Sequence, residues 1–199
     1  MRLVLDRPVL DSAMKLAPLD RDLRGPFDSS EVGLLAPHLD FGSLRISPRE
    51  GLQIRAEVEE STKRIIALTL ELENHKLQLQ AFSAPTKDGM WEEVMQQTIV
   101  AIQEQNGTVE LLEGQLGKEL RVTAPVSMHG QVSFKETRVV GVDGPRWFLR
   151  GIFSGEELYS TSRYLTLVEL FRTVVVHRGD FPIPPGELLP ITLPIQEQA

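Results

Sequence analysis

One predicted strand carries the side chains with the clearest capacity for recognition chemistry. Residues 146–153 follow an Asp-Gly-Pro turn signal, and alternation along a strand places Arg146, Phe148 and Arg150 on one face. Arginine and aromatic side chains carry much of the energy at protein interfaces, and the same three residues could hold a phosphate or stack on a base. The structural alternative is that Trp147 is core and both arginines are solvated. We take Arg146, Phe148 and Arg150 as a candidate binding patch.

A second candidate lies where the first helix is predicted to begin. Gly89 and the helix N-terminus after it offer free backbone N–H groups, which form a generic anion site. Asp88 is the predicted N-cap. Trp91 in the first helical turn is a candidate binding residue beside it, with a core anchor as the structural alternative. No phosphate-binding motif supports the site, because neither GxxxxGK[ST] nor GxGxxG occurs.

A third candidate is the polar face of the predicted sheet. Its side chains alternate with apolar ones along three strands: Arg55, Glu57, Glu59, Glu71, Glu73, Gln78 and Gln80. Such a face is ordinarily exposed to water, with its charges paired across strands. The alternative is that the N-terminal arm, the proline-rich tail or a partner covers it, because an uncovered antiparallel face is a natural docking surface.

The sequence offers little for catalysis or metal binding. It has no cysteine, and its four histidines lack metal-ligand spacing: His38, His75, His129 and His177. Ser127 precedes His129 by two residues, but no GxSxG elbow is present. We therefore predict a protein that is not an enzyme and that needs no cofactor and no metal.

Length and composition fit one globular domain. The chain has 199 residues, of which 41% are hydrophobic and 25% charged, so it can form a core and is not disordered as a whole. Its net charge of −7 argues against a nucleic-acid partner. The apolar runs fall far short of the roughly 20 residues that span a bilayer, and Asp6 and Pro8 interrupt any signal-peptide pattern. We predict a cytoplasmic protein without membrane association.

The elements that position these residues are two groups of strands, each followed by a helix. Apolar and polar residues alternate over 52–59, 66–73, 77–82, 120–126, 132–142 and 146–153, after an opening strand at 39–46, and a further strand is expected at 108–113. This alternation predicts antiparallel strands with one buried and one wet face. Helical spacing predicts a helix from Trp91 to the stop at Asn106-Gly107, and another over 162–177 with Gly179 as its stop. The fold class is therefore α+β, an antiparallel sheet of about seven to eight strands with two main helices packed on it.

Prolines divide the chain into three parts. Residues 1–38 form an arm that is expected to be extended, with one or two short turns, because of four prolines: Pro8, Pro18, Pro26 and Pro37. Residues 39–180 form the single α+β domain. Residues 181–199 form an extended proline-rich tail that is expected to pack on the domain through four apolar residues: Leu188, Leu189, Ile191 and Leu193.

Several long motifs resemble one known family. They read VGVDGPRWFLRG at 140–151, LDFGSL at 39–44, LQLQAFSAP at 77–85, RGD at 178–180 and PPGELLP at 184–190. Together they resemble an actinobacterial family catalogued as a domain of unknown function, over residues 26–194. The order of elements, the Trp-led first helix and the Asp-Gly hairpin also resemble the PsbP-like α/β sandwich. That fold occurs in a photosystem subunit, a Ran-binding regulator and secretion-effector chaperones, so the resemblance implies binding of other proteins.

We predict from these features a non-enzymatic protein-binding module with an adaptor or chaperone-like role. The alternative is a protein that binds a phosphate-bearing ligand or a nucleic acid through Arg146, Arg150 and the helix end at Gly89. Self-association of the chain through a sheet edge is a further alternative.

Overall fold

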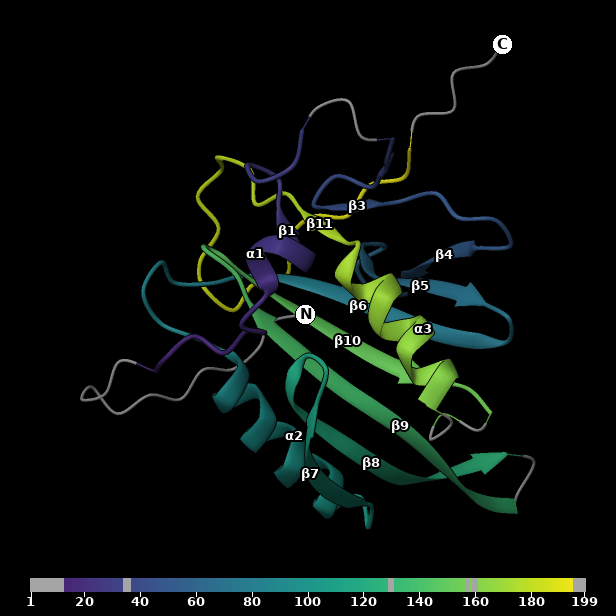
Figure 1. The fold of residues 1–199 in the computed structure, drawn as a ribbon. Helices are drawn as coiled ribbons and strands as arrows, with labels where there is room; N and C mark the ends of the chain where they lie inside the picture. The colour runs from purple at the N-terminus through teal and green to yellow at the C-terminus, as the bar shows by residue number, and fades with distance from the viewer. Residues whose placement is uncertain (1–12, 34–36, 129–130, 157, 159–160, 195–199) are drawn as a thin grey trace.

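A large curled sheet with helices on both faces, and a small sheet beside it, make up the computed structural model (Figure 1). The structure describes residues 13–33, 37–128, 131–156, 158 and 161–194. Within them the elements follow in this order: α1 (Arg21–Arg24), β1 (Phe27–Asp28), β2 (Leu39–Asp40), β3 (Leu44–Ile46), β4 (Gln53–Val58), β5 (Ile65–Leu72), β6 (His75–Ser83), α2 (Trp91–Glu104), β7 (Thr108–Gly114), β8 (Gly117–Met128), β9 (Gln131–Asp143), β10 (Trp147–Ser154), α3 (Thr161–Arg172) and β11 (Val175–Val176). No helix within these ranges is both long and apolar enough to cross a membrane.

The large sheet has seven strands in the order β4-β5-β6-β10-β9-β8-β7, and every neighbouring pair is antiparallel. The turn between β5 and β6 lies at Glu73 and Asn74, both with positive φ. Asparagine tolerates this left-handed conformation better than most residues do. The predicted α+β class, with an antiparallel sheet and two main helices, is confirmed.

The two long helices cover opposite faces of the large sheet, and each covers only part of its face. Helix α3 packs on apolar side chains of β5, β6 and β10, such as Leu70, Leu79 and Leu149. Helix α2 packs on the other face, against residues such as Leu120 on β8 and Phe148 on β10. The predicted division into one buried and one wet face is therefore wrong for the whole sheet. The face with α2 is buried over the outer strands and open along the inner ones, and α3 covers part of the other face.

Helix α3 ends earlier than its apolar spacing predicts. The helix predicted over 162–177 ends at Arg172, and Val175–Val176 form β11 instead. Strand β11 pairs in parallel with β1 and antiparallel with β3, and β-branched valine suits a strand better than a helix. Gly179 lies beyond β11 and is not the stop of α3. The small sheet therefore takes residues that the spacing assigns to the helix.

Both ends of the described chain dock on the domain. The arm contains the single helical turn α1 and then β1, which joins the small sheet. The predicted opening strand at 39–46 is divided at Gly42 into β2 and β3, and Gly42 forms a bridge with Ile191 of the tail. In the tail Leu188, Leu189 and Ile191 are buried as expected, whereas Leu193 is exposed.

Candidate functional site

The open half of the face that carries α2 forms a trough along β4, β5, β6, β10 and β9. It has a volume of about 400 Å³. Its lining residues, which define the trough here, are Arg55, Ala56, Glu57, Thr69, Glu71, Lys76, Gln78, Lys135, Thr137, Ile152 and Ser154. None of the described residues of the arm, the tail or the helices lines it. The polar sheet face predicted from the sequence is therefore open in the part of the chain that the structure describes.

The structure brings most of the predicted polar face together. Four of its seven members line the trough: Arg55, Glu57, Glu71 and Gln78. Gln80 lies further along β6 on the same face and is buried. Glu59 and Glu73 do not belong to the trough, because they lie in the turns beyond β4 and β5. The alternation identifies the face correctly and overestimates its length by one residue at each turn.

Most charges in the trough are paired with one another. Glu57 accepts a hydrogen bond from Gln78 Nε2 at 2.6 Å. Glu71 lies between two cations, with its Oε2 3.6 Å from Arg55 Nη2 and 3.8 Å from Lys76 Nζ. Cross-strand pairs of this kind hold side chains in place on a sheet surface. Glu71 is thus neutralised by its two cationic neighbours, whereas Glu57 is held by neutral hydrogen-bond donors and keeps its charge.

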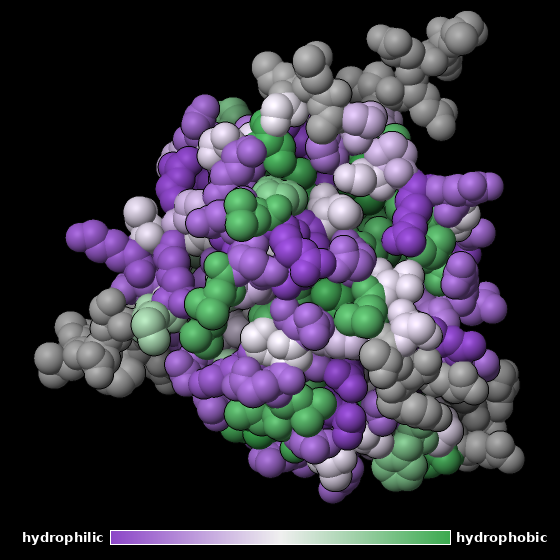
Figure 2. Space-filling model, viewed as in Figure 1, coloured by the Kyte–Doolittle hydropathy of each residue, from purple (hydrophilic) through white to green (hydrophobic). Residues whose placement is uncertain are grey.

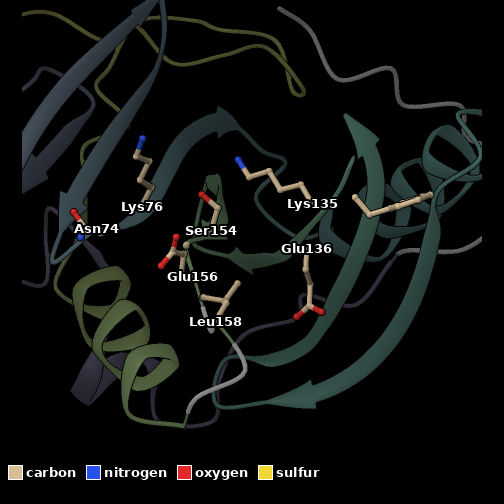
Figure 3. Close-up of a pocket in the computed structure, with 9 residues that line it drawn as sticks. Asn74, Lys76, Lys135, Glu136, Ser154, Glu156 and Leu158 are labelled. Carbon is tan, nitrogen blue, oxygen red and sulfur yellow. The ribbon is translucent and has the colours of Figure 1, made fainter. Parts of the chain in front are cut away.

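Lys135 is different, because no described carboxylate forms an ion pair with it. A second hollow of about 490 Å³ continues the trough toward the outer end of β9, and Lys76, Lys135 and Ser154 line both hollows. Figure 3 shows Ser154 between the two lysines, with the Lys135 side chain extended toward it. Lys76 is shared with Glu71, and Glu136 and Glu156 line the second hollow. The ammonium group of Lys135, which forms no ion pair with a described carboxylate, is therefore the source of local positive charge at the junction of the hollows.

The predicted binding patch on β10 is not an exposed patch. Phe148 is fully buried, with its ring centroid 6.1 Å from that of Phe82. Arg150 shares this face, donates two hydrogen bonds to Gln80 Oε1 and lies over the Phe82 ring. Burial lowers the pKa of the Arg150 guanidinium. Arg146 precedes β10 and is exposed. The structure thus corrects the expectation that these three side chains form one open patch. The Phe148 ring packs in the core, and Arg150 is bonded to Gln80.

The N-terminus of α2 is capped by Asp143, at the end of β9. Its carboxylate accepts the backbone N–H of Met90 at 2.8 Å and that of Trp91 at 3.3 Å. It also accepts the N–H of Leu16 from the arm at 2.9 Å. Burial raises the pKa of Asp143, although these N–H donors act in the opposite direction. Asp88, predicted as the N-cap, is not the capping residue, since the cap position is Met90 and has no side-chain cap bond of its own.

Gly89 and Trp91 are likewise used by the fold. The N–H of Gly89 donates to the carbonyl of Ala13 at 2.7 Å, and a Cβ at Gly89 would lie 2.4 Å from the carbonyl oxygen of Met14. Trp91 is buried and its Nε1 donates to the carbonyl of Lys118 at 2.8 Å. The N–H groups expected to be free for an anion are therefore taken by the arm and by the carboxylate cap, and Trp91 is a core anchor.

Sequence reasoning missed a buried charged cluster on the opposite face of the sheet. Glu119 on β8 is 0% exposed and accepts hydrogen bonds from Arg138 on β9 and from Tyr164 on α3, the latter at 2.8 Å. The Arg138 guanidinium lies over the Tyr164 ring. Glu119 and Arg138 occupy wet positions in the alternation of β8 and β9, and only the packing of α3 shows that these positions are covered. The cluster joins α3 to the outer strands.

The trough combines several kinds of polar group. It is lined by two ammonium groups, a guanidinium group, two carboxylates, hydroxyl groups and an amide. Among the described residues no group of three or more histidine, aspartate or glutamate side chains could hold a metal ion. Ser127 lies on β8, whereas His129 falls outside the described residues.

A family model described as "Protein of unknown function (DUF3710)" matches residues 25–199. The chain belongs to the DUF3710 family. This confirms the resemblance to a domain of unknown function that the motifs indicate. The matched range contains the trough, both long helices and the described tail, and begins shortly before β1. A comparison of this DUF3710 protein with curated proteins finds no match.

Among solved structures, this DUF3710 protein is similar to the solution structure of cyanobacterial PsbP (CyanoP) from Synechocystis sp. PCC 6803. The TM-score is 0.41 at 10% sequence identity, and the match covers 76% of this chain and 99% of the other. A PsbP structure is therefore among the structural matches of the chain, as the sequence resemblance predicts.

Proposed function

We propose that this DUF3710 protein is a non-enzymatic, cytoplasmic protein-binding module, with an adaptor or chaperone-like role, that holds a partner in the trough. One observation carries the proposal: half of a sheet face is open and concave where the described arm, tail and helices do not cover it. Glu71 is paired with cations inside the trough and Glu57 is hydrogen-bonded there, while no described carboxylate forms an ion pair with Lys135. Polar, partly charged surfaces of this kind are common in non-obligate interfaces.

Outside the trough and its neighbour, the described surface has a separate hollow of about 520 Å³ beside the small sheet, lined by residues such as His177, Phe181 and Pro190. On the face shown in Figure 2, apolar side chains form small separate patches surrounded by polar ones. The alternative, a phosphate-bearing ligand or a nucleic acid on Arg146 and Arg150, is weakened because Arg150 is bonded to Gln80. The trough and the neighbouring hollow share three lining residues and therefore form one continuous depression.

A paired charge reversal tests the proposal. Lys76→Glu with Lys135→Glu reverses the local charge of the trough, and Lys63→Glu with Lys87→Glu is the matched control, because both of these lysines are exposed and lie outside the trough. Lysate of cells that make the protein is passed over each immobilised variant, and retained proteins are quantified by mass spectrometry. We expect retention of the partner to fall at least tenfold for the trough variant and to stay unchanged for the control.

A crosslinking experiment locates the contact independently. A photoreactive residue at Gln78, in the trough, should crosslink the same partner that the wild type retains, and one at Val100, on the exposed face of α2, should not. Equal retention by both charge variants, or crosslinking from Val100 and not from Gln78, would overturn the proposal.

A further inference from the structure

Strand β9 is longer than the strand that pairs with its inner edge. It has 13 residues, whereas β10 has 8. Strand β10 pairs with β9 only from Asp143 to Arg138. Residues 131–137 of β9 pair with β8 on their other side, and no described strand lies beside them on the β10 side. This leaves a strand-wide slot about seven residues, or about 20 Å, long.

The direction of the backbone groups in this slot follows from antiparallel geometry. The N–H of Gly144 donates to the carbonyl of Trp147 at 2.8 Å. In an antiparallel pair alternate residues point their N–H and C=O toward the same neighbour. The backbone N–H and C=O groups of Val142, Val140 and Arg138 therefore point toward β10. The same alternation, continued outward, points the N–H and C=O groups of three residues into the slot: Glu136, Phe134 and Val132.

Residues 155 and 156, which follow β10, line the hollow beside the slot but do not continue β10 along β9. Gly155 has a φ of 152°, and a Cβ there would lie 2.6 Å from the His75 ring. The carbonyl of Glu156 accepts hydrogen bonds from His75 Nε2 at 3.0 Å and from Arg163 Nη1 at 3.3 Å. Residues 155 and 156 are therefore fixed over the start of β6 and the start of α3. They turn aside instead of continuing β10 along β9.

The two faces of the slot differ in chemistry. Lys135 and Lys76 lie on the trough side. Phe134 and Val132 lie on the other side of β9 and are 68% and 67% exposed. An apolar patch is visible at the outer end of the β8–β9 hairpin, at the lower right of Figure 2. An unpaired strand edge with exposed apolar side chains favours pairing with another strand.

We infer that an extended segment of the partner adds to the large sheet as a strand beside Val132, Phe134 and Glu136. Successive side chains of a strand point to opposite faces. The segment would place acidic side chains beside Lys135 and Lys76, and apolar side chains beside Phe134. The partner segment is therefore an acidic peptide in which acidic and apolar residues alternate. This inference rests on the proposed function and specifies what the trough binds.

Two synthetic peptides test the inference on the full-length protein. The first is an acetylated seven-residue peptide that alternates Glu with Val, and the second has Lys in place of each Glu. Binding is measured by fluorescence anisotropy. We expect the Glu peptide to bind at least tenfold more tightly than the Lys peptide and to weaken as salt is raised. Equal binding of both peptides, or binding of neither, would overturn the acidic-strand assignment.

Amide hydrogen exchange tests strand addition directly. At saturating Glu peptide, the amides of Val132, Phe134 and Glu136 should exchange at least tenfold more slowly. The amides of Ser133 and Lys135 point toward β8 and should change much less. Uniform protection of all five amides, or none, contradicts strand addition at this edge. Protection that arises from dimerisation without peptide, detected by light scattering, would show that a second copy of the chain occupies the slot instead.

Proline substitution separates this inference from the proposed function. Phe134→Pro removes one N–H that faces the slot, and proline is tolerated at sheet edges. Leu111→Pro is the matched control, because the same alternation points the Leu111 N–H off the outer edge of β7. We expect Phe134→Pro to lower peptide binding at least tenfold and Leu111→Pro to leave it unchanged. A partner that is retained by Phe134→Pro but lost by the trough charge reversal would refute strand addition alone, and one retained by both would refute both proposals.

Discussion

Replacing Asp143 with alanine removes the acceptor of three backbone N–H groups, those of Leu16, Met90 and Trp91. Loss of an N-cap side chain costs about 0.5–2 kcal/mol, and one further part-buried N–H left unpaired adds about 1 kcal/mol. We expect the free energy of unfolding to fall by about 1.5–3 kcal/mol. In a chain of this length each kcal/mol lowers the Tm by about 2–4 °C, so the Tm should fall by about 3–12 °C.

Urea denaturation followed by tryptophan fluorescence measures this change. Both tryptophans, Trp91 and Trp147, are buried, so unfolding exposes them to water. Asp88→Ala is the control, because Asp88 is the cap that the sequence alone predicts. We expect it to change the free energy of unfolding by less than about 1 kcal/mol. A loss below about 0.5 kcal/mol for Asp143→Ala, or a larger loss for Asp88→Ala, would refute the assignment of the cap.

Three further predictions concern pH and packing. Burial raises the pKa of Asp143. The part of its stability contribution that is linked to protonation is therefore fully present below the carboxyl's pKa in the unfolded chain and is lost as pH rises through the native pKa. The free energy of unfolding of the wild type minus that of Asp143→Asn should fall as pH rises from acid to neutral, and a rise would contradict this. Gly141→Ala puts a Cβ 2.4 Å from the Trp91 ring and should lower the free energy of unfolding in urea by about 1–3 kcal/mol. Gly33→Ala, with nothing within 4 Å of the new Cβ, should lower it by less than about 0.5 kcal/mol. Equal losses for the two variants would count against this packing. Burial, together with the hydrogen bond to Glu119, raises the pKa of Tyr164. The stability linked to the protonated hydroxyl is therefore present at neutral pH and lost at alkaline pH. Tyr164→Phe should reduce the loss of stability that circular dichroism detects at alkaline pH, and parallel pH profiles of the two proteins would exclude the Tyr164–Glu119 cluster as the source of that loss.

The parts of the fold that depend on neighbours in the sequence were predictable. Alternation over 77–82 and 146–153 identifies β6 and β10, and the Asp143-Gly144 signal identifies the turn between β9 and β10. The helix from Trp91 to Glu104 follows from apolar spacing of 3.6 residues. In each case the determining interactions lie within one element or one hairpin, so the local pattern contains the information.

The parts that depend on distant contacts were not predictable. Asp143 caps a helix that begins 52 residues earlier in the chain, and no local pattern distinguishes it from Asp88 beside the helix. Arg150 meets Gln80 across 70 residues, because the register of β6 and β10 places them opposite one another. Alternation correctly assigns Arg150 and Phe148 to one face. It does not show whether that face is open or packed.

The same limit explains why the trough was only partly predictable. The two-residue alternation of a strand shows which residues share a face. The strand register and the helices decide which half of that face is covered. Here α2 covers the outer strands on one face and α3 the inner strands on the other, so the open polar half lies beside a buried apolar half. The alternation over 132–142 is already longer than that over 146–153, which indicates a strand that outruns its neighbour. That the excess remains unpaired depends on Gly155 and on the contacts of Glu156 with His75, which redirect the chain at the end of β10. The free edge of β9 is thus a consequence of tertiary structure, and its amide exchange in the peptide-free protein should already differ between slot-facing and β8-facing residues.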